Sequence, residues 1–232
     1  SKGVSVDELY ESTGIDKWFL YKMKRLVDFE AKLRASSLSQ PDFPSILKEA
    51  KCLGFSDKQV GQCLGLAEDR VREMRKGLGI VPVTKIVDTM AAEWDSRTNY
   101  CYTCYGDSES DIVKRPNVKK VAVLGAGCIR IGSSVEFDYC TMQTAWALKE
   151  GGMDEVIVIN NNPETVSTDF DMTDKLYFEE LTLERILDIY DKEAPYGVVG
   201  SVGGQIPNNL ALKLDKAGVK LLGTTSESID QA

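Results

Sequence analysis

Apolar residues in the first third of the chain recur at the three- and four-residue spacing of amphipathic helices. Asp16 and Ser56 are suited to begin two of these helices, because their side chains can accept hydrogen bonds from a first helical turn. The helix after Asp16 carries a predicted apolar stripe of Trp18, Phe19, Met23, Leu26, Val27 and Leu33. With further helices predicted at 44–53 and 67–76, the pattern favours an all-helical domain, which we place at residues 1–106.

In the second half, strand and helix patterns alternate. Polar residues at 107–117 are interpreted as a linker, and the second domain is placed at 118–232. Its predicted strands are 121–124, 156–159, 176–178, 198–202 and 219–222, and helices are expected between them, one of them at 207–217. Such alternation implies right-handed crossovers and a parallel sheet covered on both faces. The predicted fold class is α/β with an all-α N-terminal domain, the second domain being Rossmann-like.

Three predicted loops follow strands and contain mostly small or polar residues: 125–134, 160–168 and 203–207. Ligands of parallel sheets gather at the carboxyl ends of the strands, so we expect these loops to meet in one crevice. The first loop contains Gly125, Gly127 and Gly132 and leads into a helix. A helix N-terminus after such a loop suits an anion, but the glycines could equally serve only strand–helix packing.

Composition excludes several classes of function. The net charge of −8 argues against a nucleic-acid partner, and no apolar run approaches the roughly 20 residues that cross a bilayer. The chain has no histidine, which rules out Ser-His or Cys-His catalysis within it. Six scattered cysteines favour reduced thiols of a cytosolic type. The first residues enter a helix almost at once, so we interpret the chain as a fragment whose true N-terminus is missing.

Three local patterns have competing interpretations. Residues 55–75 have the outline of a DNA-binding helix-turn-helix, but acids accompany the basic residues, which favours a packed helical hairpin. Cys101 and Cys104 form a CxxC without a second ligand pair for zinc, in a strand-like run at 98–105. The loop after 121–124 resembles a dinucleotide site, but its glycines are spaced G-x-G-x4-G, and three asparagines, Asn160 to Asn162, stand where an acid would bind ribose.

Longer motifs resemble one family, the large subunit of carbamoyl phosphate synthetase. LGAGCIRIGSSVEFDYC, NPETVSTDFDMTDKLYFE and SVGGQIPNNLA are similar to the opening of its second synthetase half, the domain before the ATP-grasp fold. Upstream, SVDELYESTGIDKWFL, KCLGFSDKQV and VDTMAAEW resemble its helical oligomerisation domain. The resemblance covers nearly the whole chain in the family's order, and RIGSSVEF is closer to eukaryotic members.

The resemblance implies a role for the parent enzyme. That ligase makes carbamoyl phosphate from bicarbonate, ammonia or glutamine, and two ATP, in the arginine, urea and pyrimidine pathways. ATP, Mg and K are implied for its ATP-grasp domains, whereas no cofactor and no metal are expected in this fragment, which should be inactive alone. The implied partners are the remaining domains of the same subunit, a glutaminase subunit or domain, and a second copy bound through the helical domain. The implied compartment is the cytoplasm or the mitochondrial matrix.

The resemblance also implies which residues line a tunnel for carbamate. By the family's pattern, residues 132–136 form its late part, and Ser134 replaces a bacterial glycine at the narrow point. Glu136 is interpreted either as a wall carboxylate or as an ordinary first-turn acid. We expect no catalytic residue here. The predicted tunnel or crevice residues are Gly125, Gly127, Gly132, Ser133, Ser134, Glu136, Asn162, Thr165, Gly203, Gly204 and Gln205.

Overall fold

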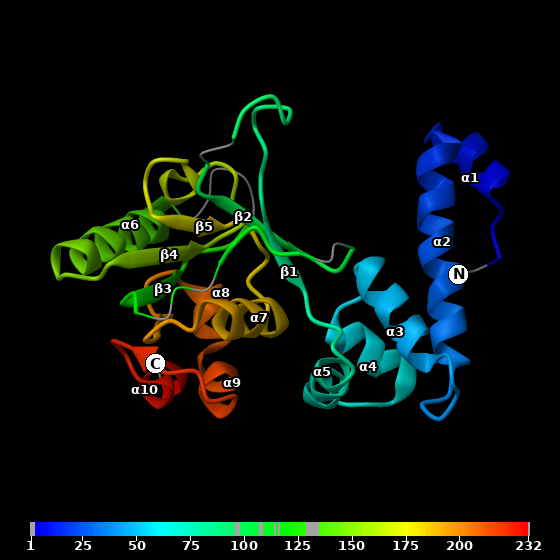
Figure 1. Cartoon of the computed structure of the whole chain (residues 1–232). Helices are drawn as coiled ribbons and strands as arrows, with labels where there is room; N and C mark the ends of the chain where they lie inside the picture. The colour runs from blue at the N-terminus through cyan, green and yellow to red at the C-terminus, as the bar shows by residue number, and fades with distance from the viewer. Residues whose placement is uncertain are drawn as a thin grey trace. The chain divides into compact units, whose positions relative to one another are not determined.

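A computed structural model describes residues 3–95, 98–106, 109–113, 115, 117–128 and 135–231. The chain divides into two compact units, Ser1–Val81 and Pro82–Ala232, which we describe separately (Figure 1). This division places residues 82–106 with the sheet, whereas the sequence had assigned them to the helical domain. The physical reason is that this segment forms two strands whose backbone groups pair with the sheet of the second unit.

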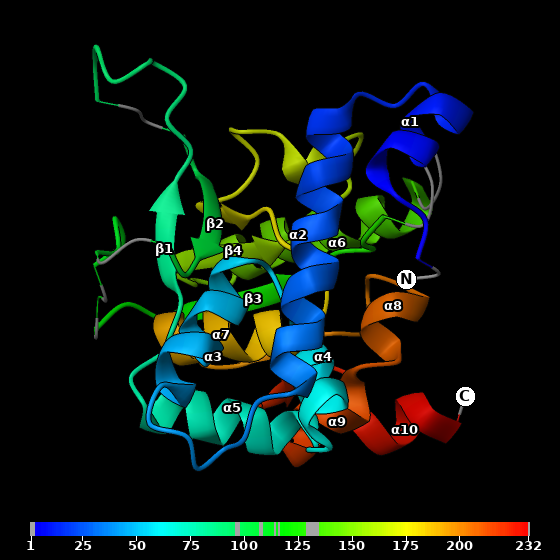
Figure 2. The ribbon, with the colours of Figure 1, turned by 90° about the vertical axis from the view of Figure 1, so that its right-hand side faces the viewer.

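The described part of the first unit is helical. Its helices are α1 (Val6–Thr13), α2 (Lys17–Arg34), α3 (Phe43–Cys52), α4 (Asp57–Leu64) and α5 (Glu68–Gly77). Ser5 and Ser56 each begin a helix with a capping box, and Asp16 accepts the Trp18 N–H at the start of α2, so these starts follow from the sequence. Figure 2 shows α1 folded back beside one end of the long α2.

A buried ion network joins three helices of this unit. The Asp57 carboxylate at the start of α4 accepts hydrogen bonds from Lys51 Nζ at 2.9 Å and from Arg75 Nε at 2.8 Å. Asp57 and Arg75 are fully buried. Arg75 therefore faces the interior, as expected for a packed helical hairpin, and is not offered to a DNA groove.

The predicted stripe on α2 is mostly exposed. Of its members only Leu33 is buried, whereas Trp18 and Met23 are 60% and 62% exposed. The core of the unit is instead built by Leu20, Phe29 and Leu33 of α2 together with apolar residues of the following helices. The stripe has helical spacing, but apart from Leu33 its side chains remain largely exposed within the described residues.

The second unit is built on a seven-stranded sheet in the order β1-β2-β5-β4-β3-β6-β7. Its strands are β1 (Val83–Ile86), β2 (Tyr100–Cys104), β3 (Lys120–Leu124), β4 (Glu155–Ile159), β5 (Lys175–Tyr177), β6 (Val198–Val199) and β7 (Leu221–Leu222). All pairs are parallel except β1 with β2. The predicted parallel sheet is thus confirmed, and the sequence missed an antiparallel strand pair at its edge.

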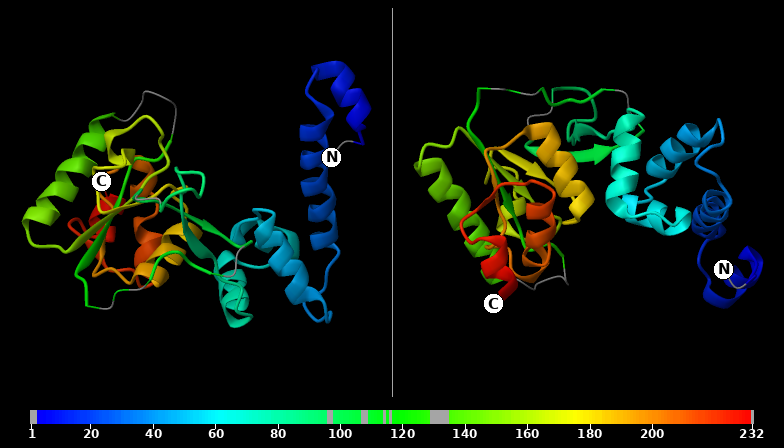
Figure 3. Two further views of the ribbon diagram at one scale, coloured as in Figure 1. Left: turned by 45° about the horizontal axis from the view of Figure 1, so that its top comes forward. Right: turned by 90° about the horizontal axis from the view of Figure 1, so that it is seen from below.

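Helices cover both faces of this sheet, as Figure 3 shows for α6 and α7 on opposite sides. The helices are α6 (Val135–Glu150), α7 (Leu183–Glu193), α8 (Gln205–Asn208), α9 (Ala211–Lys216) and α10 (Ser226–Gln231), with the 3-10 turn η1 (Val166–Thr168). Alternate residues of β3 and β4 enter two cores. Leu124 and Ile157 pack towards α7, and Val123 and Val158 towards α6.

Three predicted elements differ in length or continuity, one of them the strand expected at 219–222, which spans only Leu221–Leu222. The helix expected at 207–217 is divided into α8 and α9, with Asn209 and Leu210 between them. The strand expected at 198–202 ends after Val199. The end of β6 and the break between α8 and α9 lie on either side of the loop at Gly203.

Candidate functional site

The loop after β3 is held closely against its neighbours. A Cβ added at Gly125 would lie 2.6 Å from Asn160 Cγ, and one added at Gly203 would lie 2.3 Å from the Gly125 carbonyl oxygen. Gly127 has a φ of 69°, the left-handed region that favours glycine. The predicted meeting of the three loops is therefore confirmed for their described residues.

Asn160 connects two of these loops. It follows β4 and is 1% exposed. Its Oδ1 accepts the N–H groups of Gly127 at 3.0 Å and Asn161 at 2.9 Å, and its Nδ2 donates to Ser167 Oγ at 3.0 Å. The amide is thus fully engaged within the protein, at the position where a dinucleotide-binding domain would present an acid to ribose.

The turn after Asn160 is held together by hydrogen bonds between its polar side chains and its own backbone. The carbonyl oxygen of Asn162 accepts hydrogen bonds from the hydroxyls of Thr165 and Thr168, both at 3.0 Å. The Asp138 carboxylate on α6 accepts the backbone N–H of Val166 at 2.8 Å. Asn162 and Thr165 therefore shape the backbone at the crevice, and their predicted place in the tunnel wall stays a prediction.

The third loop contributes backbone and one exposed amide. Gly203 and Gly204 are buried, and a Cβ at Gly204 would lie 2.8 Å from the Phe137 ring of α6. Gln205 is exposed at the start of α8, and its side chain donates to Asn209 Oδ1 at 2.8 Å. Gly204 thus allows α6 to pack directly on this loop, whereas Gly203 allows the loop to approach the backbone at the end of β3.

The remaining predicted residues lie where the glycine loop enters α6. Gly132, Ser133 and Ser134 lie outside the described residues. Glu136 lies in the first turn of α6 and is exposed, a position that fits either interpretation of its carboxylate. No described group of three or more His, Cys, Asp or Glu side chains is arranged to hold a metal ion.

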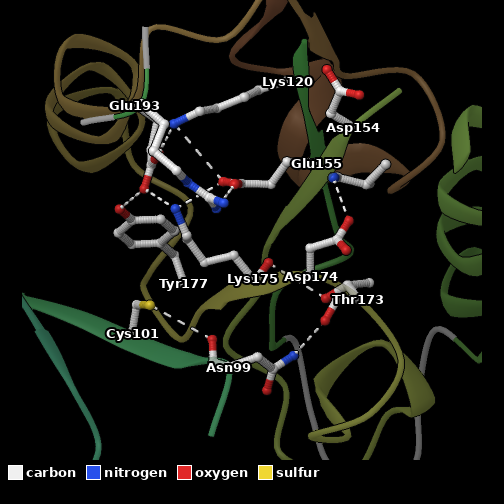
Figure 4. A network of polar contacts seen from close by, with 12 residues as sticks. Asn99, Cys101, Lys120, Asp154, Glu155, Thr173, Asp174, Lys175, Tyr177 and Glu193 are labelled. Atoms are coloured by element: carbon white, nitrogen blue, oxygen red, sulfur yellow. Dashed lines mark hydrogen bonds and ion pairs between the residues drawn. The ribbon is translucent and has the colours of Figure 1, made fainter. Parts of the chain in front are cut away.

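A buried charge cluster that the sequence did not reveal lies where β3, β4 and β5 begin, at the amino ends of these strands (Figure 4). We use this name for Lys120, Glu155, Lys175 and Glu193 together with Tyr177. Glu193 is 2.7 Å from Lys120 Nζ and 2.8 Å from Lys175 Nζ, and it accepts the Tyr177 hydroxyl at 2.6 Å. Glu155 lies 2.8 Å from Lys175 Nζ. Arg115 also pairs with Glu155.

The cluster perturbs the groups within it. Burial by itself raises the pKa of Glu193, but the hydrogen bonds from Lys120, Lys175 and Tyr177 outweigh it and hold this pKa below its usual value. Burial also raises the pKa of Tyr177, and raises that of the neighbouring Cys101 thiol to about 12. The only hint in the sequence was that charged residues begin three apolar strands, which ordinarily indicates exposed strand ends.

None of the six cysteines, all of which the structure describes, forms a disulfide, and Cys101 is buried in the sheet whereas Cys104 is partly exposed. The CxxC pair therefore presents its two thiols differently, as expected for residues three apart on a strand. Among the described helices, none combines the length and the apolar character that a bilayer crossing requires.

Comparison with known proteins identifies both units. The family model "Carbamoyl phosphate synthase preATP-grasp domain" matches residues 117–231, and "Carbamoyl-phosphate synthetase large chain, oligomerisation domain" matches residues 1–79. The second match ends close to Val81, where the first compact unit ends.

Relatives from distant organisms match nearly the whole chain. The mitochondrial ammonia-type carbamoyl-phosphate synthase of Rattus norvegicus is 51% identical over 99% of this chain and 15% of its own length. The carbamoyl phosphate synthase large chain of Thermoanaerobacter sp. is 49% identical over 99% of this chain and 21% of its own. The arginine-specific large chain of the carbamoyl phosphate synthase of Cutaneotrichosporon cutaneum is 51% identical over 98% of this chain and 19% of its own length.

These relatives are several times longer than this chain, which spans about a fifth of their length or less. The two matched domains follow one another in this chain, the oligomerisation domain first. By these matches the chain belongs to the carbamoyl phosphate synthase large-chain family, of which it represents two consecutive domains.

Proposed function

We propose that this chain is part of a carbamoyl phosphate synthase, in which its second unit lines the path of carbamate and its first unit holds subunits together. The names of the relatives support the parent activity. The observation that carries the local role is the meeting of three loops of small residues at one edge of the sheet, joined through Asn160. The parent ligase joins bicarbonate, ammonia and ATP, and its nitrogen comes from glutamine or free ammonia.

The chemistry of the crevice fits a wall better than a reaction centre. The described polar side chains at the junction, Asn160, Asn162 and Thr165, bond to the protein's own backbone and hydroxyls. A passage for an unstable anion needs small, internally satisfied groups, because strong cationic partners would retain it. Gly132, Ser133, Ser134 and Glu136 are proposed to continue this wall towards α6.

Nucleotide and metal ions belong to other domains in this proposal. ATP, Mg²⁺ and K⁺ are proposed to bind in ATP-grasp domains outside these 232 residues, consistent with the name of the pre-ATP-grasp family model. The described side chains at the crevice include no lysine or arginine that contacts Asn160 or Thr165 and could hold a triphosphate. The remaining domains of the same subunit and a glutaminase subunit or domain are its proposed partners.

The test compares the full-length enzyme with this chain alone. The full-length enzyme should form carbamoyl phosphate from bicarbonate, ammonia and MgATP, measured by trapping the product with ornithine. The 232-residue chain, assayed beside it, should neither hydrolyse ATP nor bind it at micromolar concentrations in calorimetry. Absence of product from the full-length enzyme would refute the parent activity, and ATP turnover by the short chain would refute the division of roles.

A second role, assembly, is favoured by the exposed stripe on α2. Trp18, Met23 and Leu26 are all exposed on one long helix, and the matched family model is named for oligomerisation. Contiguous exposed apolar side chains of this size are typical of contact surfaces. We propose self-association through this stripe, in the cytoplasm or the mitochondrial matrix, where free thiols such as those found here persist.

A further inference from the structure

Asn160 combines features that set it apart from the other polar residues of the crevice. It is buried, it lies at the end of a central strand, and both ends of its amide are engaged. Oδ1 accepts from the glycine loop through Gly127 N, and Nδ2 donates to the turn after β4 through Ser167 Oγ. An amide is the side chain of this size that accepts and donates at once, so it joins a backbone donor on one loop to a hydroxyl on another.

The packing around Asn160 leaves this side chain little freedom. Gly125 passes directly beneath it, and a Cβ there would overlap its Cγ, Cβ and Nδ2 at 2.6 to 2.8 Å. The Gly125 carbonyl in turn lies against Gly203 of the third loop. The amide therefore rests on the point where the three loops touch, and a shift of Asn160 would be transmitted to each of them.

From this arrangement we infer that Asn160 is a positioning residue, which fixes residues 125–128 of the glycine loop against the turn after β4, so that the wall stays closed around the anion passing along it. The inference rests on the proposed function. Asn160 acts through Gly127 and Ser167 and does not itself touch the anion. When its bonds are lost, the loop separates from the turn after β4, and carbamate escapes to water before the second phosphorylation.

Escape of carbamate through the wall can be distinguished from a loss of stability by the amount of ATP consumed per product. Carbamate that escapes has already consumed ATP, so the ATP hydrolysed per carbamoyl phosphate formed rises. A variant that is only less stable has fewer active molecules, but each spends ATP as the wild type does. The ratio therefore reports on the wall and is independent of the amount of folded enzyme.

The experiment uses the full-length enzyme with Asn160→Asp, which keeps the shape and the acceptor but loses the Nδ2 donor. We expect the ATP-to-product ratio to rise above the wild-type ratio, because more of the carbamate escapes after its formation has already consumed one ATP. Asn117→Asp is the matched control, because Asn117 is exposed and gains the same charge. Its ratio should equal that of the wild type.

A second variant keeps the test decisive if Asn160→Asp fails to fold. Ser167→Ala removes the nearer of the two hydroxyls that Nδ2 donates to, the other being Thr165 Oγ1 at 3.4 Å. The Ser167 backbone N–H keeps its bond to Asp138 in this variant. Its ratio should rise in the same direction. A wild-type ratio in whichever variant is active would overturn the role of Asn160. A wild-type enzyme that forms no carbamoyl phosphate would instead overturn the proposed function, so the two failures are distinguishable.

Discussion

At the scale of single residues, the tightest constraint in the crevice is the contact between Gly203 and the Gly125 carbonyl. A Cβ at position 203 would lie 2.3 Å from that oxygen and 2.7 Å from the Leu124 carbonyl oxygen. Both are backbone atoms of a buried strand end, so they cannot move aside as a flexible side chain would. The glycine is therefore required by space rather than by its φ angle.

Gly203→Ala should accordingly destabilise the chain by about 1–3 kcal/mol, the usual cost of overpacking, or by more. The measurement is the free energy of unfolding in urea. Gly77→Ala is the matched control, because Gly77 ends α5 and a Cβ there meets nothing within 4 Å. That variant should stay within about 0.5 kcal/mol of the wild type, as is usual for an exposed position at a helix end. Equal effects at the two positions would refute the close approach.

The buried thiol of Cys101 should be chemically inert. Its pKa is raised to about 12 by burial, so at pH 8 only about one molecule in 10,000 carries the thiolate that reacts with alkylating reagents. Iodoacetamide labelling followed by mass spectrometry should modify the exposed Cys140 first, and Cys101 only after denaturation. Labelling of both at similar rates in the native chain would contradict this environment.

Single residues also show what the sequence could reveal. A close approach of backbone at Gly125 and Gly127 was predictable from a glycine-rich loop after an apolar strand, whereas the place of these glycines in a tunnel wall stays a prediction. The role of Asn160 was not predictable from the sequence. It depends on hydrogen bonds to Gly127 and Ser167 that form only when the chain folds. The partners of a buried polar group cannot be deduced from spacing alone.

At the scale of elements, α7 is anchored to the sheet by charge as well as by apolar packing. Glu193 ends α7 and meets Lys120 of β3 and Lys175 of β5. Its pKa is lowered, so the folded state prefers the ionised carboxylate. The stability that this preference provides is complete above the pKa of the unfolded chain and is lost as pH falls through the lowered folded value.

Glu193→Gln should therefore cost about 3–5 kcal/mol at pH 7, because two buried ammonium groups lose their shared partner. The difference from the wild type should narrow below about pH 4.3, where the unfolded glutamate becomes protonated. Urea unfolding at a series of pH values measures both effects. Glu150→Gln, an exposed change at the end of α6, should stay within about 0.5 kcal/mol of the wild type throughout. A difference independent of pH would contradict the assignment.

Element boundaries were harder to predict than element types. The central strands were visible as apolar runs, and Ser56 and Asp16 marked helix starts. The β1–β2 pair was not recognised as part of the sheet, because β2 pairs with β5, a strand some 70 residues later that supplies its parallel partner. The local residue pattern predicts an extended segment at 98–105, but it does not indicate which strand this segment pairs with.

At the scale of the whole molecule, the exposed stripe on α2 should govern association. Trp18→Glu and Met23→Glu each place a charge among apolar side chains that are otherwise uncovered. If two copies meet there, each variant should weaken self-association at least about tenfold, the loss that follows when a buried side chain of this size is removed. Sedimentation velocity over a range of concentrations measures the effect on the 232-residue chain.

The control is Lys48→Glu, which changes the charge of an exposed position on α3, away from the stripe. It should associate as the wild type does. A wild-type chain that stays monomeric at high concentration would contradict self-association through this stripe. The apolar stripe itself was predictable from spacing, but whether it faces the unit's own core was not, because that depends on which side of α2 the later helices occupy.

The buried charge cluster has a consequence for how the sheet is assembled. Lys120 and Glu155 occupy matching first positions of β3 and β4, paired residue for residue along the two strands. A register shift of one residue between β3 and β4 would move the Lys120 ammonium or the Glu155 carboxylate to the other face of the sheet, among apolar side chains. The buried group of opposite charge would then lose its ion-pair partner. The buried ions therefore make a pairing of β3 with β4 that is shifted by one residue energetically costly, and so favour the native register.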